Sequence, residues 1–228
     1  MMLQDSFDIL YQFYSKKNKV YRVQFNKGLF YGKTAIMKVF GEKSVKAYER
    51  DMLINLKRLG VNVPLFLNEG EDFIIMEDIG DDLLLNRYEN MEESQSYDFI
   101  SIVRPTCDWL KSFYAATKNY YKKEIALNDV NFRNFIFVKN KVVGIDFEQV
   151  SEGSIATDIG KLAAYSLTYS PERTNWKYDF VEYEIDYLCN ELNIKRDDVI
   201  NEFRRELANI QCRRHQNKLS KASGLCKL

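Results

Sequence analysis

The feature that most constrains the fold is a change in hydrophobic period near residue 92 of the 228-residue chain. Before this point, segments such as KVYRVQF (19–25) and KTAIMKVF (33–40) alternate apolar and polar side chains, which is typical of strands. Between them and two further strand-like segments lies SVKAYERDMLINLKRLG (44–60), in which the apolar spacing is helical and Gly60 is a typical helix end. We therefore expect a β-rich part that contains one helix.

After residue 92 the spacing is mainly helical, and Pro105 is expected to break the first of these helices near its start. Only NFIFV-KN-KVVGID (134–146) has a strand–turn–strand pattern there. The order predicts an α+β protein with two lobes and a cleft between them. Residues 1–80 would form the N-terminal lobe, and residues 81–228 would form a helical C-terminal lobe that carries the hairpin.

The hairpin is flanked by polar residues at a spacing that phosphoryl transfer could use. Asp129 and Asn134 lie five residues apart in LNDVNFRN, and Asp146 follows Asn134 by twelve. Phosphoryl transfer needs a carboxylate to orient the acceptor hydroxyl, and a carboxylate and an amide oxygen to hold Mg²⁺. Asp and Asn are also common turn residues that bond to nearby backbone, so the spacing alone favours that structural interpretation.

A lysine and a glutamate upstream strengthen the functional interpretation. Lys38 lies among apolar residues in a predicted inner strand, and Glu49 follows eleven residues later in the predicted helix. A buried lysine is costly without a partner, and a Lys38–Glu49 pair that reaches nucleotide phosphates would satisfy it. The alternative is an edge strand from which Lys38 faces water.

Composition argues against several other classes of protein. Lysine plus arginine equals aspartate plus glutamate at 33 each, so the whole-chain charge gives no signal for nucleic acid or membrane. The only histidine is His215, which argues against His-ligated metals and Ser-His-Asp chemistry. The four cysteines form no CxxC pair, and neither a signal peptide nor a membrane-spanning apolar run is seen. These features predict a cytoplasmic protein.

Taken in order, these segments resemble the protein-kinase-like superfamily, and particularly its aminoglycoside phosphotransferase and choline-kinase branch. SKKNKVYRV resembles the nucleotide loop, AIMKVF the lysine strand, YERDMLINL the glutamate helix, FIIMEDIG the inter-lobe hinge and NDVNFRN the catalytic loop. The most specific likeness is GIDFEQVSEGSIATDIG, where DFE, Gly153 and DIG are characteristic of the small-molecule branch and protein kinases have DFG. The resemblance covers most of the chain.

The resemblance implies an enzyme that uses ATP and Mg²⁺ to phosphorylate a hydroxyl group of a small molecule. Asp129 would be the catalytic base or the group that orients the hydroxyl, and Asp158 a structural brace of the catalytic loop. Lys38, oriented by Glu49, would bind phosphate. The remaining implied roles are metal ligation by Asn134 and Asp146, and nucleotide binding by Lys17, Asn18 and the hinge residues Met76, Glu77 and Ile79.

Three departures from the family pattern keep alternatives open. Leu127 stands where the family has a largely architectural histidine, with Asn128 after it. The nucleotide loop lacks glycines, so Lys16 or Lys17 would have to compensate by charge. The chain is short, nearer in size to RIO-type or lipopolysaccharide core kinases. A compact protein Ser/Thr or glycolipid kinase is one alternative, and a pseudokinase that serves as an interaction module is another.

The acceptor is the least readable part of the sequence. A predicted helix carries acidic residues that could bind a cationic acceptor, although the solvated face of an amphipathic helix explains them better. The basic C-terminal tail could touch an anionic surface, but a frayed, solvated terminus is the favoured interpretation. The acidic residues are Asp179, Glu182, Glu184, Asp186 and Glu191, and the basic ones are Arg213, Arg214, Lys218, Lys221 and Lys227.

Overall fold

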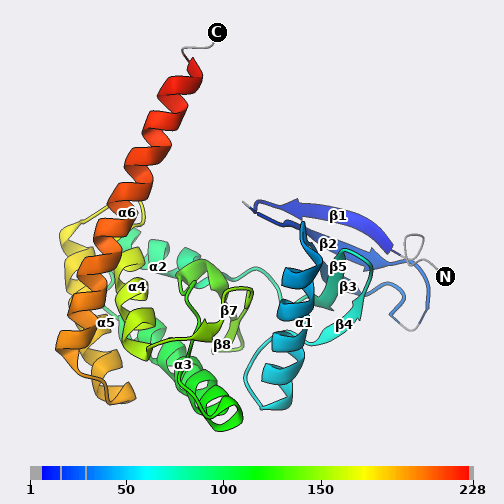
Figure 1. Ribbon diagram of the computed structural model, residues 1–228, viewed down its shortest axis with the longest axis horizontal. Helices are drawn as coiled ribbons and strands as arrows, with labels where there is room; N and C mark the ends of the chain where they lie inside the picture. Colours follow the sequence, from blue (N-terminus) through cyan, green and yellow to red (C-terminus); the bar gives the residue numbers. More distant parts are fainter. Residues whose placement is uncertain (1–6, 16, 29, 226–228) are drawn as a thin grey trace.

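The protein is a mixed α+β structure, in which a five-stranded antiparallel sheet and six helices are seen among the described residues (Figure 1). The computed structural model describes residues 7–15, 17–28 and 30–225, with side chains described as far as residue 216. The sheet ends at Glu77 and the second helix begins at Leu84. The change from strands to helices therefore falls between residues 77 and 84, earlier than the change in hydrophobic period near residue 92, because the helix that begins at Leu84 precedes that point.

The sheet has the strand order β1-β2-β3-β5-β4, and every neighbouring pair is antiparallel. Alternation along the strands places Val23, Ala35 and Ile75 in a small apolar cluster on one face. Lys38 lies on the opposite face of the central strand β3 and is only 6% exposed, so the edge-strand alternative is wrong. The strands are β1 (Phe7–Phe13), β2 (Lys19–Phe25), β3 (Thr34–Val39), β4 (Phe66–Glu69) and β5 (Phe73–Glu77).

Helix α1 (Lys43–Arg58) lies beside the sheet and supplies the partner of Lys38 (Figure 1). Its apolar residues at helical spacing, among them Met52, Leu53 and Leu56, are buried, as the sequence predicts. Gly60 follows the helix with a φ of +83°, a left-handed conformation that favours glycine. Glu49 is buried in the same helix.

The rest of the chain is helical and carries two short two-stranded sheets (Figure 1). The predicted hairpin is confirmed: Phe135–Val138 (β7) pairs with Lys141–Gly144 (β8), and Lys139 and Asn140 make the turn with positive φ. The strand before the hairpin, Ile125–Ala126 (β6), pairs with the strand after it, Ser151–Glu152 (β9). The helices are α2 (Leu84–Glu93), α3 (Ile100–Tyr121), α4 (Ile155–Thr168), α5 (Asn175–Leu192) and α6 (Arg196–Leu225), with a short 3₁₀ turn at Phe132–Asn134.

The expected break at Pro105 is wrong, because α3 continues through it. Pro105 stands early in the helix, so the hydrogen bond that it cannot donate would have gone to the carbonyl of Ser101 in the first turn. Ser101 is exposed, and its carbonyl can be hydrated instead. The pattern also gave no separate prediction for β1, α2, β6 and β9.

Asn62, in the loop after α1, joins the two parts of the molecule. Its carbonyl oxygen accepts hydrogen bonds from Trp109 Nε1 (2.7 Å) in α3 and from the backbone N–H of Gly144 (3.1 Å) at the end of β8. A Cβ on Gly144 would lie 2.2 Å from the Trp109 ring, so glycine is required for this close approach. These bonds fix the hairpin relative to the loop that follows α1, and this helps to position the site.

Candidate active site

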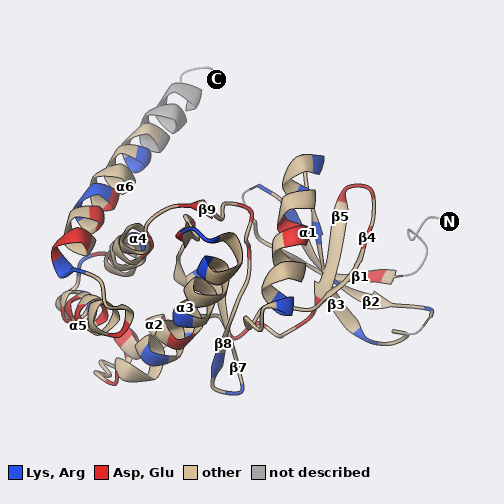
Figure 2. Ribbon diagram, turned by 60° about the horizontal axis from the view of Figure 1, so that its bottom comes forward, with Lys and Arg blue, Asp and Glu red and all other residues tan. Residues whose placement is uncertain are grey.

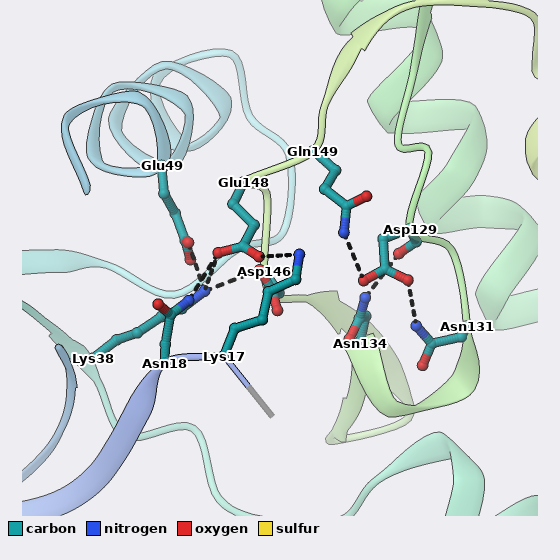
Figure 3. A network of polar contacts seen from close by, with 10 residues as sticks. All are labelled: Lys17, Asn18, Lys38, Glu49, Asp129, Asn131, Asn134, Asp146, Glu148 and Gln149. Carbon is teal, nitrogen blue, oxygen red and sulfur yellow. Dashed lines mark hydrogen bonds and ion pairs between the residues drawn. The ribbon is translucent and has the colours of Figure 1, made fainter. Parts of the chain in front are cut away.

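The centre of the candidate site is the ammonium group of Lys38, which three carboxylates surround (Figure 3). Its Nζ lies 2.6 Å from Glu49 Oε2 in α1, 2.9 Å from Asp146 Oδ1 after β8, and 3.8 Å from Glu148 Oε2. Thus the lysine and glutamate that the sequence pairs are in contact, and Asp146 joins them from 108 residues away.

The excess of negative charge around one ammonium group governs protonation here. Burial lowers the pKa of Lys38, but the attraction of Glu49 and Asp146 outweighs it and leaves that pKa raised. Burial also raises the pKa of Glu49 to about 7 against the attraction of Lys38, and the like charges of Asp146 and Glu148 add to the rise. The site has more carboxylate charge than Lys38 can neutralise.

Glu148 is a site residue to which the sequence analysis assigned no role. Lys17 Nζ (3.2 Å) and Asn18 Nδ2 (2.8 Å), both from the turn between β1 and β2, donate to its two carboxylate oxygens. Burial raises the pKa of Glu148, but Lys38, Asn18 and Lys17 outweigh it and lower that pKa overall. Its place two residues after Asp146, in the quoted DFE motif, was the available signal. Lys16 lies outside the described residues.

Asp129 lies beside this cluster, and amide groups hold it (Figure 3). Asn131 Nδ2 donates to its Oδ1 (3.0 Å), and Gln149 Nε2 donates to its Oδ2 (3.3 Å). Asn134 Nδ2 donates to the Asp129 backbone carbonyl (2.8 Å), while the Asn134 carbonyl accepts from Ile145 N–H (2.9 Å). Burial and the nearby charge of Asp146 raise the pKa of Asp129. The predicted catalytic and metal-binding residues are therefore brought together.

Asp158 holds the backbone of the predicted catalytic loop from the start of α4. Its fully buried carboxylate accepts from the N–H groups of Leu127 (2.6 Å) and Asn128 (2.9 Å), and from the hydroxyl of Tyr114 (3.0 Å). Leu127 is buried and packs in the main apolar core. The interpretation of Asp158 as a structural brace agrees with these contacts.

The predicted hinge begins inside strand β5 and continues past its end. Met76 is buried in β5, and the N–H of Glu77 donates to the carbonyl of Leu65 (2.8 Å), so that N–H already has an acceptor. Ile79 lies beyond the strand end. Arg22 forms an ion pair with Asp78 (Nε to Oδ2, 2.8 Å), which links β2 to this segment. The sequence analysis missed this pair, because nothing in the pattern relates positions 56 residues apart.

Among the described residues, the side-chain hydrogen bonds of the Asp129 carboxylate come from Asn131 and Gln149, and from none of the proposed acceptor features. The hydrogen bond and charge of Glu206 raise the pKa of Arg213, and the charge of Asp129 adds to that rise. Acidic side chains are frequent on α5 (Figure 2), but Glu184 is buried, so placing it on a solvated face is wrong. A cavity of about 520 Å³ lies against α5, and none of its lining residues comes from the 124–150 segment. In the basic tail, Arg213 pairs with Glu206 (2.6 Å) and Arg214 with Glu172 (2.5 Å). The side chains of Lys218, Lys221 and Lys227 lie outside the described part.

A divalent cation has suitable ligands at one place in the described residues. Carboxylate oxygens of Glu49, Asp146 and Glu148 lie within 4.8 Å of one another. Oxygen donors of this kind suit Mg²⁺. The side-chain nitrogen of Asn134 donates to the backbone carbonyl of Asp129, so this residue could bind a metal ion only through its side-chain oxygen.

No protein-family model and no curated protein matches the chain. Among the described residues, no helix is both long enough and apolar enough to span a membrane.

Proposed function

We propose that the chain is an ATP- and Mg²⁺-dependent phosphotransferase with a two-lobed, protein-kinase-like arrangement, which transfers the γ-phosphoryl group to a hydroxyl of a small molecule. The observation that carries the proposal is the Lys38 cluster. A buried lysine on a central strand contacts a helix glutamate and, from the other side, an aspartate that follows a hairpin. Asp129 lies next to that hairpin.

The contacts support a role for each of these residues. Glu49 holds Lys38 in place, so that its ammonium group would be pre-organised to bind phosphate oxygens. Asp129 would accept the hydrogen bond of the acceptor hydroxyl and point its oxygen at the phosphoryl group. Ile79 and the neighbouring backbone would hold the adenine.

Asp146 and Glu148, whose carboxylate oxygens lie close together, would be oxygen ligands of a magnesium ion, and we propose Asn134 as a further ligand. Bound there, Mg²⁺ would neutralise phosphate charge as it shifts during transfer. The 2.9 Å contact with Lys38 would keep the Asp146 carboxylate oriented toward the proposed metal position. Catalysis would thus depend mainly on positioning and on charge already in place.

The test uses radiolabelled ATP, Mg²⁺ and a panel of aminoglycosides, choline-like alcohols and sugars. Asp146→Asn should abolish transfer while the melting temperature stays close to that of the wild type. Asp108→Asn, on an exposed position of α3, is the matched control and should transfer at the wild-type rate. An undiminished transfer rate for Asp146→Asn would refute the proposed role of Asp146.

A pseudokinase is a second candidate, and one observation favours it. Lys17 and Asn18 already occupy both carboxylate oxygens of Glu148, which places the loop across part of the proposed metal site. Thermal unfolding with ATP, measured with and without Mg²⁺, separates the two functions. A metal-dependent rise in melting temperature supports the enzyme, and no such rise supports the pseudokinase.

A further inference from the structure

We propose that Gln149 is a positioning residue for Asp129 and that it links the metal-binding segment to the catalytic loop. The inference rests on the proposed function, because it concerns the same site. Gln149 directly follows Glu148, yet its side chain extends toward Asp129 on the other side of the site (Figure 3).

The carboxylate of Asp129 is held from two directions. Asn131 lies in the same loop and binds Oδ1, whereas Gln149 comes from the segment after the hairpin and binds Oδ2. A side chain held at one oxygen only can still rotate about that bond. With both oxygens bound, the plane of the carboxylate is fixed, which is the property that an acceptor-orienting group requires.

Asn128 in turn donates a hydrogen bond to the backbone of Gln149, which fixes the point from which the Gln149 side chain extends. Asn128, the residue before Asp129, donates from Nδ2 to the backbone carbonyl of Gln149 (3.1 Å) and to the hydroxyl of Ser151 (2.9 Å). The loop thus holds the backbone of Gln149, and the side chain of Gln149 holds the loop.

Asn128 itself is firmly placed. Its φ of +62° is uncommon for a residue other than glycine, and hydrogen bonds of its N–H, its carbonyl and its side chain maintain it. Its N–H donates to Asp158, its carbonyl accepts from Lys161 Nζ (2.9 Å), and its side chain bonds to the 149–151 segment. This support makes the reciprocal pair of Asn128 and Gln149 a defined connection, although Gln149 itself is exposed.

The connection gives the site a means of coupling. Lys17 and Asn18 hold the carboxylate of Glu148, and the next residue along the chain orients Asp129. Gln149 therefore connects the carboxylate of Asp129 to the segment that Lys17 and Asn18 hold through Glu148.

Steady-state kinetics test the role with three variants and the acceptor that the screen finds to be phosphorylated fastest. Gln149→Ala should lower kcat about tenfold and leave KM for MgATP within about twofold, because only the geometry of Asp129 is changed. Gln149→Glu should be worse than Gln149→Ala, since an acceptor with like charge replaces the donor. Gln211→Ala, on an exposed position of α6, is the control and should match the wild type.

If Gln149 only filled space, the isosteric glutamate would be milder than alanine, and that result would overturn the proposal. So would an unchanged kcat in both variants. Crystal structures of the wild type and Gln149→Ala test whether Gln149 orients Asp129, and they do not require an activity assay. We expect a rotated Asp129 carboxylate in the variant, and an unmoved one refutes the role. Absence of phosphoryl transfer by the wild type would instead count against the proposed function alone.

Discussion

Replacing Lys38 by methionine should destabilise the protein as well as inactivate it. The side chains of Lys38 and Glu49 are only 7% and 3% exposed, so the substitution leaves a buried carboxylate without its cation. Removing one member of a buried pair costs about 3–5 kcal/mol. For a chain of this size, that loss corresponds to a fall in melting temperature of about 6–20 °C. Reduced activity of Lys38→Met would then have two causes.

A second substitution separates those causes. Glu49→Gln in the Lys38→Met background removes the uncompensated charge, because Glu148 keeps Lys17 and Asn18 as partners and the Asp146 side chain is 35% exposed. The double variant should regain most of the lost stability but no phosphoryl transfer. Chemical denaturation and thermal unfolding of both variants and the wild type measure this.

The matched control is Lys43→Met, which breaks a surface pair with Glu71 in which both side chains are more than 70% exposed. It should change the free energy of unfolding by less than about 1 kcal/mol. A melting temperature of Lys38→Met equal to that of the wild type would refute the reasoning. Failure of Glu49→Gln to restore stability would refute it as well.

Two further predictions concern the helical part. Burial raises the pKa of Glu184 to about 8, and its Oε2 has no hydrogen-bond partner among the described residues. The native state therefore holds this proton up to higher pH than the unfolded chain, so wild-type stability should fall as pH rises from about 4.5 to 8. Glu184→Gln should remove this slope and stabilise the protein by about 3–5 kcal/mol above pH 8, measured by urea unfolding; an identical slope would contradict this. Gly160→Ala should cost about 1–3 kcal/mol, because its Cβ would lie 2.6 Å from the Phe203 backbone nitrogen in α6. Gly41→Ala, with open space around it, should be neutral in the same thermal assay, and equal melting temperatures for both variants would count against the close packing of α4 on α6.

The sequence predicted those elements whose side-chain pattern records burial. KVYRVQF, KTAIMKVF and the helix with Met52, Leu53 and Leu56 became β2, β3 and α1, because one apolar face or stripe is enough to identify each. Strand β1 was missed for the same reason: it is an edge strand, its residues are mostly exposed, and its pattern shows no buried face. The strands β6 and β9 are two residues long, which is too short for any period.

The same limit decides which residues of the candidate site could be predicted from the sequence. Charged residues in apolar surroundings, such as Lys38 and Glu49, stand out in a sequence because burial without a partner is costly. The contacts of Glu148 with Lys17 and Asn18, and of Arg22 with Asp78, do not stand out, because these residues are unremarkable in their own segments. Only folding brings the β1–β2 turn to a carboxylate some 130 positions away.

Two of the three departures from the family pattern, Leu127 and the glycine-free loop, have different physical consequences. At Leu127 the chain supplies order by other means: the leucine packs in the core, and Asp158 binds the backbone N–H groups of Leu127 and Asn128. These contacts therefore hold the shape of the predicted catalytic loop with a leucine in place of the histidine. The glycine-free loop differs, because its polar side chains bind Glu148. A phosphate group entering beside Lys38 would have to compete with Glu148 for Lys17, and a cation would have to compete with Lys17 for Glu148. Under the proposed function, an anion and a cation together would satisfy both residues at once, whereas an anion alone would leave Glu148, whose side chain is 9% exposed, without Lys17. We therefore expect the nucleotide and the metal to bind as a pair.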